Sequence, residues 1–117
     1  MNRNELKQFI ESEFEVKPDK PWEKYPDNEV FRHRSGKWFA LIMSVKKDKI
    51  GLTGGESMDI VNFKCDTLMI GSLLEEKGIY PAYHMNKNHW ISAALDGSAD
   101  DDTIKMLLNM SYSLTDK

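Results

Sequence analysis

The sequence has little of several features that would point directly to a class of protein. No apolar run approaches the roughly 18 residues that a membrane-spanning helix needs. The polar start at residues 1–5 also lacks the apolar stretch of a secretion signal. We therefore expect a cytoplasmic protein without a membrane partner.

Cysteine is nearly absent, and glycines do not gather into a phosphate loop. The single cysteine, Cys65, excludes an internal disulfide and a zinc site built from several thiolates. Gly54 and Gly55 lack the spacing and the Lys-Ser/Thr pair of a P-loop. We expect Cys65 to be a buried thiol, and we expect neither a cofactor nor a bound metal.

The residues that are present are typical of one globular domain. The chain of 117 residues is 40% hydrophobic and 30% charged, which provides both a core and a hydrated surface. Its net charge of −3 is not that of a protein whose whole surface binds phosphate. We expect a single domain over residues 1–117.

Hydrophobic spacing predicts three helices and five strands. Apolar residues at helical spacing, followed by Pro18, predict a first helix over 3–14. Asp66 is a good N-cap for a short second helix ended by Gly78, and Ser98 resembles the start of a capping box for a third helix over 99–114. Alternating apolar residues predict strands over residues 29–34, 37–45, 58–65, 79–85 and 89–95.

The resulting order, α-β-β-β-α-β-β-α, predicts an α+β fold with helices packed on an antiparallel sheet of five strands. In the second strand, alternation predicts that Phe39, Leu41, Met43 and Val45 share one face. Trp38 and Trp90 are out of phase with the core-facing residues, so they are expected on the opposite face, packed there or exposed as an aromatic platform.

Positive charge is concentrated between residues 30 and 50. Six bases lie there against the single acid Asp48: Arg32, Arg34, Lys37, Lys46, Lys47 and Lys49. A two-residue turn at Ser35-Gly36 would place Arg34 opposite Lys37, a repulsion that phosphate would relieve. A second loop, Asn86-Lys87-Asn88, can touch another phosphate or a base edge. Ordinary solvated lysines are the alternative explanation.

Two other classes of function stay open at this point. A protein-binding or chaperone-like module would use the sheet face, or Trp22 and Trp90, as its contact surface. A small-ligand binder or an enzyme would use His84, His89 and Asp96, because paired imidazoles can do acid–base work. The spacing of the histidines matches no known zinc pattern, and we expect a binding protein rather than an enzyme.

Residues 21–114 resemble the MmcQ/YjbR family of small bacterial proteins. The matching stretches are Pro21-Trp22, Tyr25-Pro26, Val30–His33, Lys37–Ile42, Val61–Asp66, Pro81–Trp90, Leu95–Ser98 and Ser111-Tyr112. The element Asn-Lys-x-His-Trp, followed by Leu-Asp-Gly, is the most specific. Thr67 stands where the family often has proline, which leaves the start of a helix intact.

The resemblance implies a two-layer α-β(3)-α-β(2)-α fold, similar to that of secretion chaperones. It also implies a DNA-binding role attributed to a double wing of β-hairpins, and it brings no catalytic residues. The shared motif points to Asn86, Lys87, His89 and Trp90, whereas the bases of the first hairpin are proposed from charge alone. In an acidic protein such binding is expected to be weak and sensitive to salt.

Overall fold

The computed structural model describes residues 1–116, which form three α-helices, one 3-10 helix and five strands. In chain order the elements are α1 (Arg3–Phe14), β1 (Glu29–Arg32), β2 (Trp38–Lys46), η1 (Lys47–Ile50), β3 (Ser57–Lys64), α2 (Thr67–Leu73), β4 (Ile79–Pro81), β5 (Trp90–Ala94) and α3 (Asp101–Thr115). The predicted α+β fold and its order of elements are confirmed. Among residues 1–116, none of the helices has the length and apolar character that crossing a membrane requires.

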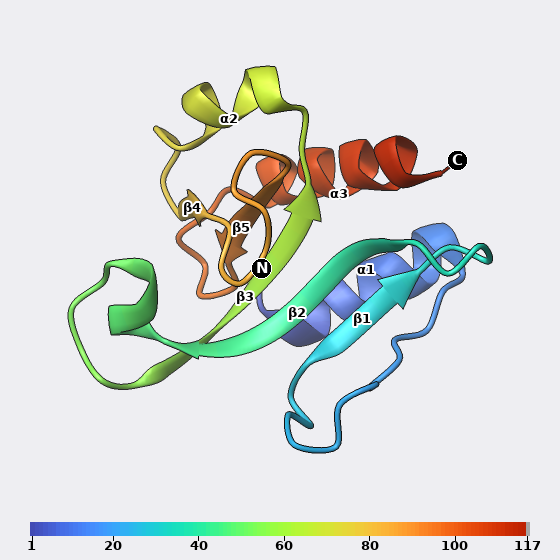
Figure 1. Ribbon diagram of the computed structural model, residues 1–117, viewed down its shortest axis with the longest axis horizontal. Helices are drawn as coiled ribbons and strands as arrows, with labels where there is room; N and C mark the ends of the chain where they lie inside the picture. The colour runs from blue at the N-terminus through green and yellow to red at the C-terminus, as the bar shows by residue number, and fades with distance from the viewer. Residues whose placement is uncertain (117) are drawn as a thin grey trace.

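The strands form one antiparallel sheet with the order β1-β2-β3-β5-β4, and α1 and α3 cover one of its faces (Figure 1). Because neighbouring strands run in opposite directions, the start of β2, the end of β3 and the start of β5 lie at the same end of the sheet. We call this the hairpin end, since it carries the turn between β1 and β2. The opposite end, which carries η1, is the loop end.

The main core fills the space between the sheet and the two long helices. Leu6 and Ile10 of α1, together with Leu107 and Leu108 of α3, are fully buried against the sheet. Burial of one such side chain stabilises a protein by roughly 1.5–3 kcal/mol. A smaller cluster lies on the other face, at the loop end: Val45, Met58, Ile60 and Ala94, with Ile50, Leu52, Tyr80 and Tyr83 packed against them. Most of the apolar burial therefore lies on the helix side.

Local signals in the sequence fix the first helix as predicted. The side chain of Asn2 accepts a hydrogen bond from the backbone N–H of Glu5, and the side chain of Glu5 accepts one from Asn2, which completes a capping box. The helix ends before Glu15, which adopts a left-handed conformation with φ of 55°. The predicted bounds 3–14 are confirmed.

The first hairpin turns one residue earlier than predicted. The backbone N–H of Gly36 donates to His33 O at 2.9 Å, and the N–H of His33 donates to Lys37 O at 2.9 Å. Arg34 and Ser35 therefore occupy the centre of the turn. The predicted pairing of Arg34 with Lys37 is wrong, because Lys37 faces His33 instead.

The predicted alternation of β2 is also wrong at its first residues. Phe39 packs in the main core, whereas Val45 and Met43 belong to the cluster on the other face. The cause is a register shift that pairs Arg32 with Trp38 and leaves Phe39 without a partner across the hairpin. A bulge of this kind adds one residue to a strand and changes the face that its side chain meets.

The bounds of the fourth strand and of the third helix also differ from the prediction. Strand β4 ends at Pro81 because Tyr83 turns onto the sheet, where its N–H donates to Ser92 Oγ and its carbonyl accepts from Asn62 Nδ2. Helix α3 begins after Asp100, and the expected capping box fails because Ser98 donates to Asp96.

Helix α2 begins at the predicted N-cap, since Asp66 Oδ1 accepts from the N–H of Leu68 at 3.0 Å. It ends at Leu73, well before Gly78, and Leu68 in its first turn is 90% exposed. Gly78 is needed for another reason: a Cβ there would lie 2.5 Å from the backbone nitrogen of Ala99.

Candidate functional site

Trp38 lies at the hairpin end, on the sheet face that α1 and α3 do not cover. The bulge turns it to the same face as its partner Arg32, whose guanidinium carbon lies 5.7 Å from the centre of the indole. Trp22, from the connector before β1, packs edge-on against Trp38 with ring centres 5.6 Å apart. The ring of Trp38 is therefore held from two sides and stays half-buried.

Trp90 occupies the matching position two strands away. It is the first residue of β5 and pairs with Lys64, the last residue of β3. The ammonium of Lys64 lies 5.6 Å from the centre of the Trp90 ring. Both tryptophans thus have a cationic side chain over the ring, an arrangement that stabilises the orientation of the aromatic group.

The two tryptophans line one groove of about 360 Å³. Its lining residues are Lys37, Trp38, Lys64, Trp90, Leu114 and Thr115. The end of α3 supplies one wall, and the first residues of β2 and β5 supply the aromatic surface. We call this the tryptophan groove.

Positive charge at the tryptophan groove is largely uncompensated. Among the described residues, no carboxylate lies within ion-pair distance of Lys37, Lys64 or the neighbouring Arg34. Arg32 is the exception, because it pairs with Asp19 at 3.0 Å. Unpaired cations beside half-buried aromatic rings are suited to an anionic partner that also has flat apolar surface.

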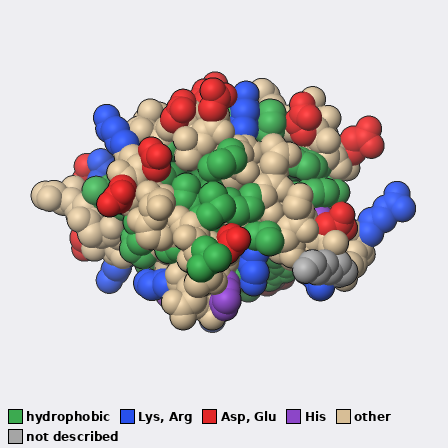
Figure 2. Space-filling model, turned by 90° about the horizontal axis from the view of Figure 1, so that it is seen from above, with side chains coloured by type: hydrophobic (Ala, Val, Ile, Leu, Met, Phe, Trp, Pro, Cys, Tyr) green, Lys and Arg blue, Asp and Glu red, His purple; other side chains and the backbone are tan. Residues whose placement is uncertain are grey.

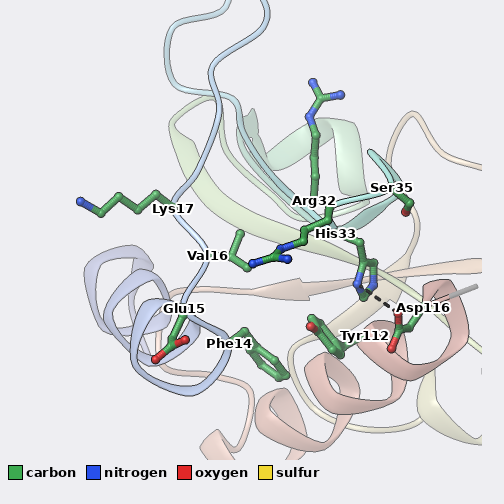
Figure 3. Close-up of a pocket in the computed structure, with 10 residues that line it drawn as sticks. Phe14, Glu15, Val16, Lys17, Arg32, His33, Ser35, Tyr112 and Asp116 are labelled. Atoms are coloured by element: carbon green, nitrogen blue, oxygen red, sulfur yellow. Dashed lines mark ion pairs between the residues drawn. The ribbon is translucent and has the colours of Figure 1, made fainter.

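A larger hollow of about 560 Å³ lies on the other side of the hairpin, between the turn and the ends of α1 and α3 (Figure 3). Its lining residues are Phe14, Glu15, Val16, Lys17, Arg32, His33, Arg34, Ser35, Tyr112 and Asp116. His33 points toward Tyr112 and Asp116; its Nε2 lies 2.8 Å from Thr115 Oγ1 and its Nδ1 lies 3.8 Å from Asp116. Hydrogen bonds and packing thus anchor the hairpin to the end of α3.

The motif Asn86–Trp90 builds the turn that positions Trp90. Asn86 Oδ1 accepts from the N–H of Asn88 at 2.9 Å, and the carbonyl of Asn86 accepts from the N–H groups of His89 and Trp90. His89 Nδ1 lies 3.2 Å from Thr67 Oγ1. Of the predicted site residues in this motif, Asn86 and His89 therefore shape the loop, and Trp90 reaches the groove.

Lys87 lies elsewhere, although it belongs to the same motif. It lines a shallow pocket of about 210 Å³ together with Lys49, Ile50 and Tyr83. This pocket lies where the loop before β5 crosses the sheet toward η1. Lys87 is thus part of a second small group of bases and does not line the tryptophan groove.

Lys46 and Lys47 lie at the loop end, so the six bases of residues 32–49 do not form one patch. The residues between Trp38 and Lys46 extend for about 26 Å, at about 3.3 Å per residue. Lys47 also pairs with Glu56 at 3.1 Å. The interpretation of residues 32–49 as one basic cluster is therefore wrong, because a long strand separates its two halves.

The histidines and Asp96 are not brought together. His89 precedes β5 and Asp96 follows it, so the strand separates them. Asp96 accepts hydrogen bonds from the N–H and the hydroxyl of Ser98, and His84 packs edge-on against Tyr83. No group of three metal-ligating side chains occurs among residues 1–116. The hypothesis of a small-ligand or catalytic site built from His84, His89 and Asp96 together is therefore not supported by their positions.

Cys65 is buried, as predicted, with 2% of its surface exposed. Burial raises the pKa of the thiol, and the neighbouring charge of Asp66 raises it further. The thiol therefore stays protonated near neutral pH, where it is a weak nucleophile.

Hydrophobic side chains also gather on the face that carries α2, with acidic groups along one border (Figure 2). Leu68 is 90% exposed and Leu74 is 37% exposed, so α2 presents apolar surface to solvent. Trp22, which was expected as part of a protein-contact surface, instead packs against Trp38. The sequence analysis did not predict this exposed apolar surface of α2.

Lys64 is the groove residue that the sequence interpretation missed. Val61, Phe63 and Cys65 alternate along this part of the chain and lie in the main core. The same alternation places Lys64 on the opposite face, where Trp38 and Trp90 were expected. The face of Lys64 could therefore be predicted from the sequence, but its pairing with Trp90 could not.

Comparisons with known proteins agree with this architecture. The model of the YjbR family matches residues 12–114. The uncharacterized protein YyaQ of Bacillus subtilis (strain 168) is 38% identical over 116 residues, which cover 98% of each chain.

Solved structures show the same fold. A crystal structure of a Pseudomonas syringae protein is 43% identical, with a TM-score of 0.96 over 98% of this chain and 99% of that one. A solution NMR structure from the same organism has a TM-score of 0.88 over 98% and 93% of the two chains, again at 43% identity. A Deinococcus radiodurans protein with the domain DUF419 is 23% identical, has a TM-score of 0.73 and covers 99% and 79% of the chains, a likeness of fold alone.

Proposed function

We propose that this chain, which belongs to the YjbR family, is a non-enzymatic nucleic-acid-binding protein whose contact surface is the hairpin end of the sheet. One observation carries this proposal: Lys37 and Lys64 share a groove with two tryptophans, and no carboxylate among residues 1–116 forms an ion pair with either lysine. Arg34 extends the same charge to the tip of the hairpin turn, where its side chain is exposed.

The charge distribution supports a local contact rather than a wide one. The net charge of −3 repels a polyanion, so attraction must come from a place where cations outnumber acids. At the hairpin end, Arg34, Lys37 and Lys64 meet this condition. At the loop end, Lys47 is paired with Glu56. Phosphate contacts of this kind release counterions, so the affinity falls as salt rises.

The test is a pair of charge reversals with equal change in net charge. Arg34→Glu with Lys37→Glu alters the hairpin end, and Lys46→Glu with Lys47→Glu alters the loop end as a matched control. Fluorescence anisotropy with labelled duplex and single-stranded DNA, at two salt concentrations, gives the affinity and its salt dependence. We expect the hairpin variant to lose about tenfold in affinity and to reduce the salt slope by about 2, since each lost phosphate contact removes about 0.9.

The control variant should retain its affinity within about twofold, and both variants should keep the far-UV circular dichroism of the parent. Unchanged binding by the hairpin variant overturns the proposal. An equal loss in both variants also overturns it, because the attraction would then be a property of net charge alone. A protein complex that survives high salt and the hairpin substitutions would favour the protein-binding alternative.

A further inference from the structure

We propose that the tryptophan groove takes unpaired bases, so that the preferred ligand is a single strand whose bases stack on Trp38 and Trp90. This inference rests on the proposed nucleic-acid-binding function and specifies its substrate class. It follows from the pairing of two indoles with two unneutralised lysines in one groove. Proteins that bind single strands combine stacking surfaces with cations that follow the backbone.

The spacing of the two indoles allows bases of one strand to reach both rings. Trp38 begins β2 and Trp90 begins β5, with β3 between them, so their backbones lie two strand spacings, or about 10 Å, apart. Lys64, at the end of β3, lies between the two tryptophans in the order of the strands, and Lys37 precedes Trp38. Cations are therefore placed where a backbone would pass if its bases lay on the rings.

Both rings are fixed before any ligand arrives. Trp22 and Arg32 hold Trp38 from two sides, and the Asn86 turn fixes the backbone of Trp90. A surface that is already ordered loses less conformational entropy on binding, which favours affinity. Solvent-exposed lysines alone would not need such support.

A duplex cannot use this surface in the same way. Its bases are already stacked and paired, so their faces reach a protein aromatic ring only after unstacking, which costs a few kcal/mol per step. The phosphates of a duplex can still contact Arg34 and Lys37. The groove therefore adds affinity for single strands beyond the phosphate contacts that both forms share.

The experiment compares three labelled oligonucleotides on the full chain. They are an oligothymidylate of about 12 nucleotides, an abasic strand with the same number of phosphates, and a duplex, with a length chosen from typical single-strand site sizes. Anisotropy gives the affinity, and tryptophan fluorescence reports stacking. We expect the thymidylate strand to bind about tenfold more tightly than the abasic strand and to quench the fluorescence, whereas the abasic strand should not quench it.

Variants then assign the effect to the groove. Trp38→Leu and Trp90→Leu keep apolar volume but remove the aromatic face, and each should weaken thymidylate binding about tenfold without changing abasic binding. Trp38→Phe and Trp90→Phe keep a ring and the fold, and they should retain most of the affinity. Tyr25→Leu is the matched control, because Tyr25 is 62% exposed and does not line the groove, and it should leave the preference for bases intact.

The outcomes separate this inference from the function on which it rests. Equal, salt-sensitive binding of thymidylate and abasic strands overturns base stacking and leaves phosphate binding standing. Failure of all three oligonucleotides to bind overturns both the stacking inference and the proposed nucleic-acid-binding function. Full thymidylate affinity in folded Leu variants also overturns the stacking role of the tryptophans, and melting curves of the Leu and Phe variants establish that they are folded.

Discussion

The two ends of the sheet both carry basic side chains but differ in what surrounds those charges. At the hairpin end, Lys37 and Lys64 stand beside indole rings, and no carboxylate of residues 1–116 pairs with them. At the loop end, Lys47 pairs with Glu56 and Arg3 pairs with Asp59 at 2.8 Å, whereas Lys46, Lys49 and Lys87 have no ion pair within the described part of the chain. Both ends therefore keep unpaired cations, and the hairpin end differs because its cations share a groove with two tryptophans.

Packing differs between the ends in the same way. Beneath the hairpin end, Phe39 contacts Phe14, Phe31, His33 and Tyr112, with ring centres between 4.9 and 6.3 Å from its own. The cluster at the loop end consists of smaller buried residues and partly exposed tyrosines. Aromatic packing of this kind adds to area burial and makes the surface above it rigid. The end that we assign to binding is therefore also the more firmly packed one.

The largest expected effect is on stability at the hairpin end. Phe39→Ala leaves a cavity among four aromatic side chains, and we expect it to lower the free energy of unfolding by about 3–5 kcal/mol. Met58→Ala, in the smaller cluster at the loop end, should cost about 2 kcal/mol. Urea unfolding followed by circular dichroism measures both, and equal losses would contradict the contrast in packing.

A smaller effect concerns the paired charges toward the loop end. Glu29 is 3% exposed and lies 3.0 Å from Arg3 and 2.8 Å from Lys7. Burial opposes its ionisation, but the contacts with Lys7 and Arg3 prevail and lower the pKa of Glu29. Glu29→Gln should therefore cost about 2–3 kcal/mol near neutral pH, because Lys7 loses its carboxylate partner and Arg3 is left with Asp59.

The stabilisation that Glu29 contributes should decrease as the pH falls. Since the pKa of Glu29 is lower in the folded chain, the stabilisation is complete above the ordinary value of 4.5 and disappears as the pH falls through the lowered one. The difference between parent and variant should thus shrink toward strongly acidic pH in urea unfolding. Asp116→Asn, at the exposed hairpin end, serves as control and should change stability little. A Glu29→Gln deficit that stays constant with pH would contradict the role of the ion pairs.

The smallest effect is expected from freeing a cation at the loop end. Glu56→Gln removes the partner of Lys47 and makes the chain less acidic by one charge. If binding belongs to the hairpin end, the affinity for labelled DNA in the anisotropy assay should change by less than about twofold, since the distance exceeds the screening length at physiological salt. A tenfold gain would instead place the contact at the loop end.

Features that depend on neighbours along the chain were predictable from the sequence. Asn2 and Asp66 cap their helices, prolines follow the end of α1, and the strands occur in the predicted order. Capping, periodicity and proline geometry act within a few residues, so the local sequence is enough to fix them. The family motif likewise marked Trp90, which lines the groove, and Asn86 and His89, which make hydrogen bonds in the turn before β5.

The candidate site depends on partners that are distant in sequence, and only the tertiary structure decided it. The sequence predicted Trp38 and Trp90 on the face opposite the core, but the register shift at Phe39, which places Trp38 beside Arg32, is visible only in the tertiary structure. Alternation has a period of two, so a bulge that no local signal announces reverses the face of every residue beyond it. The length of β2 separates Lys46 from the hairpin turn. Strand pairing brings Lys64 next to Trp90, because the register of a sheet, and not the position in the sequence, decides which residues are neighbours.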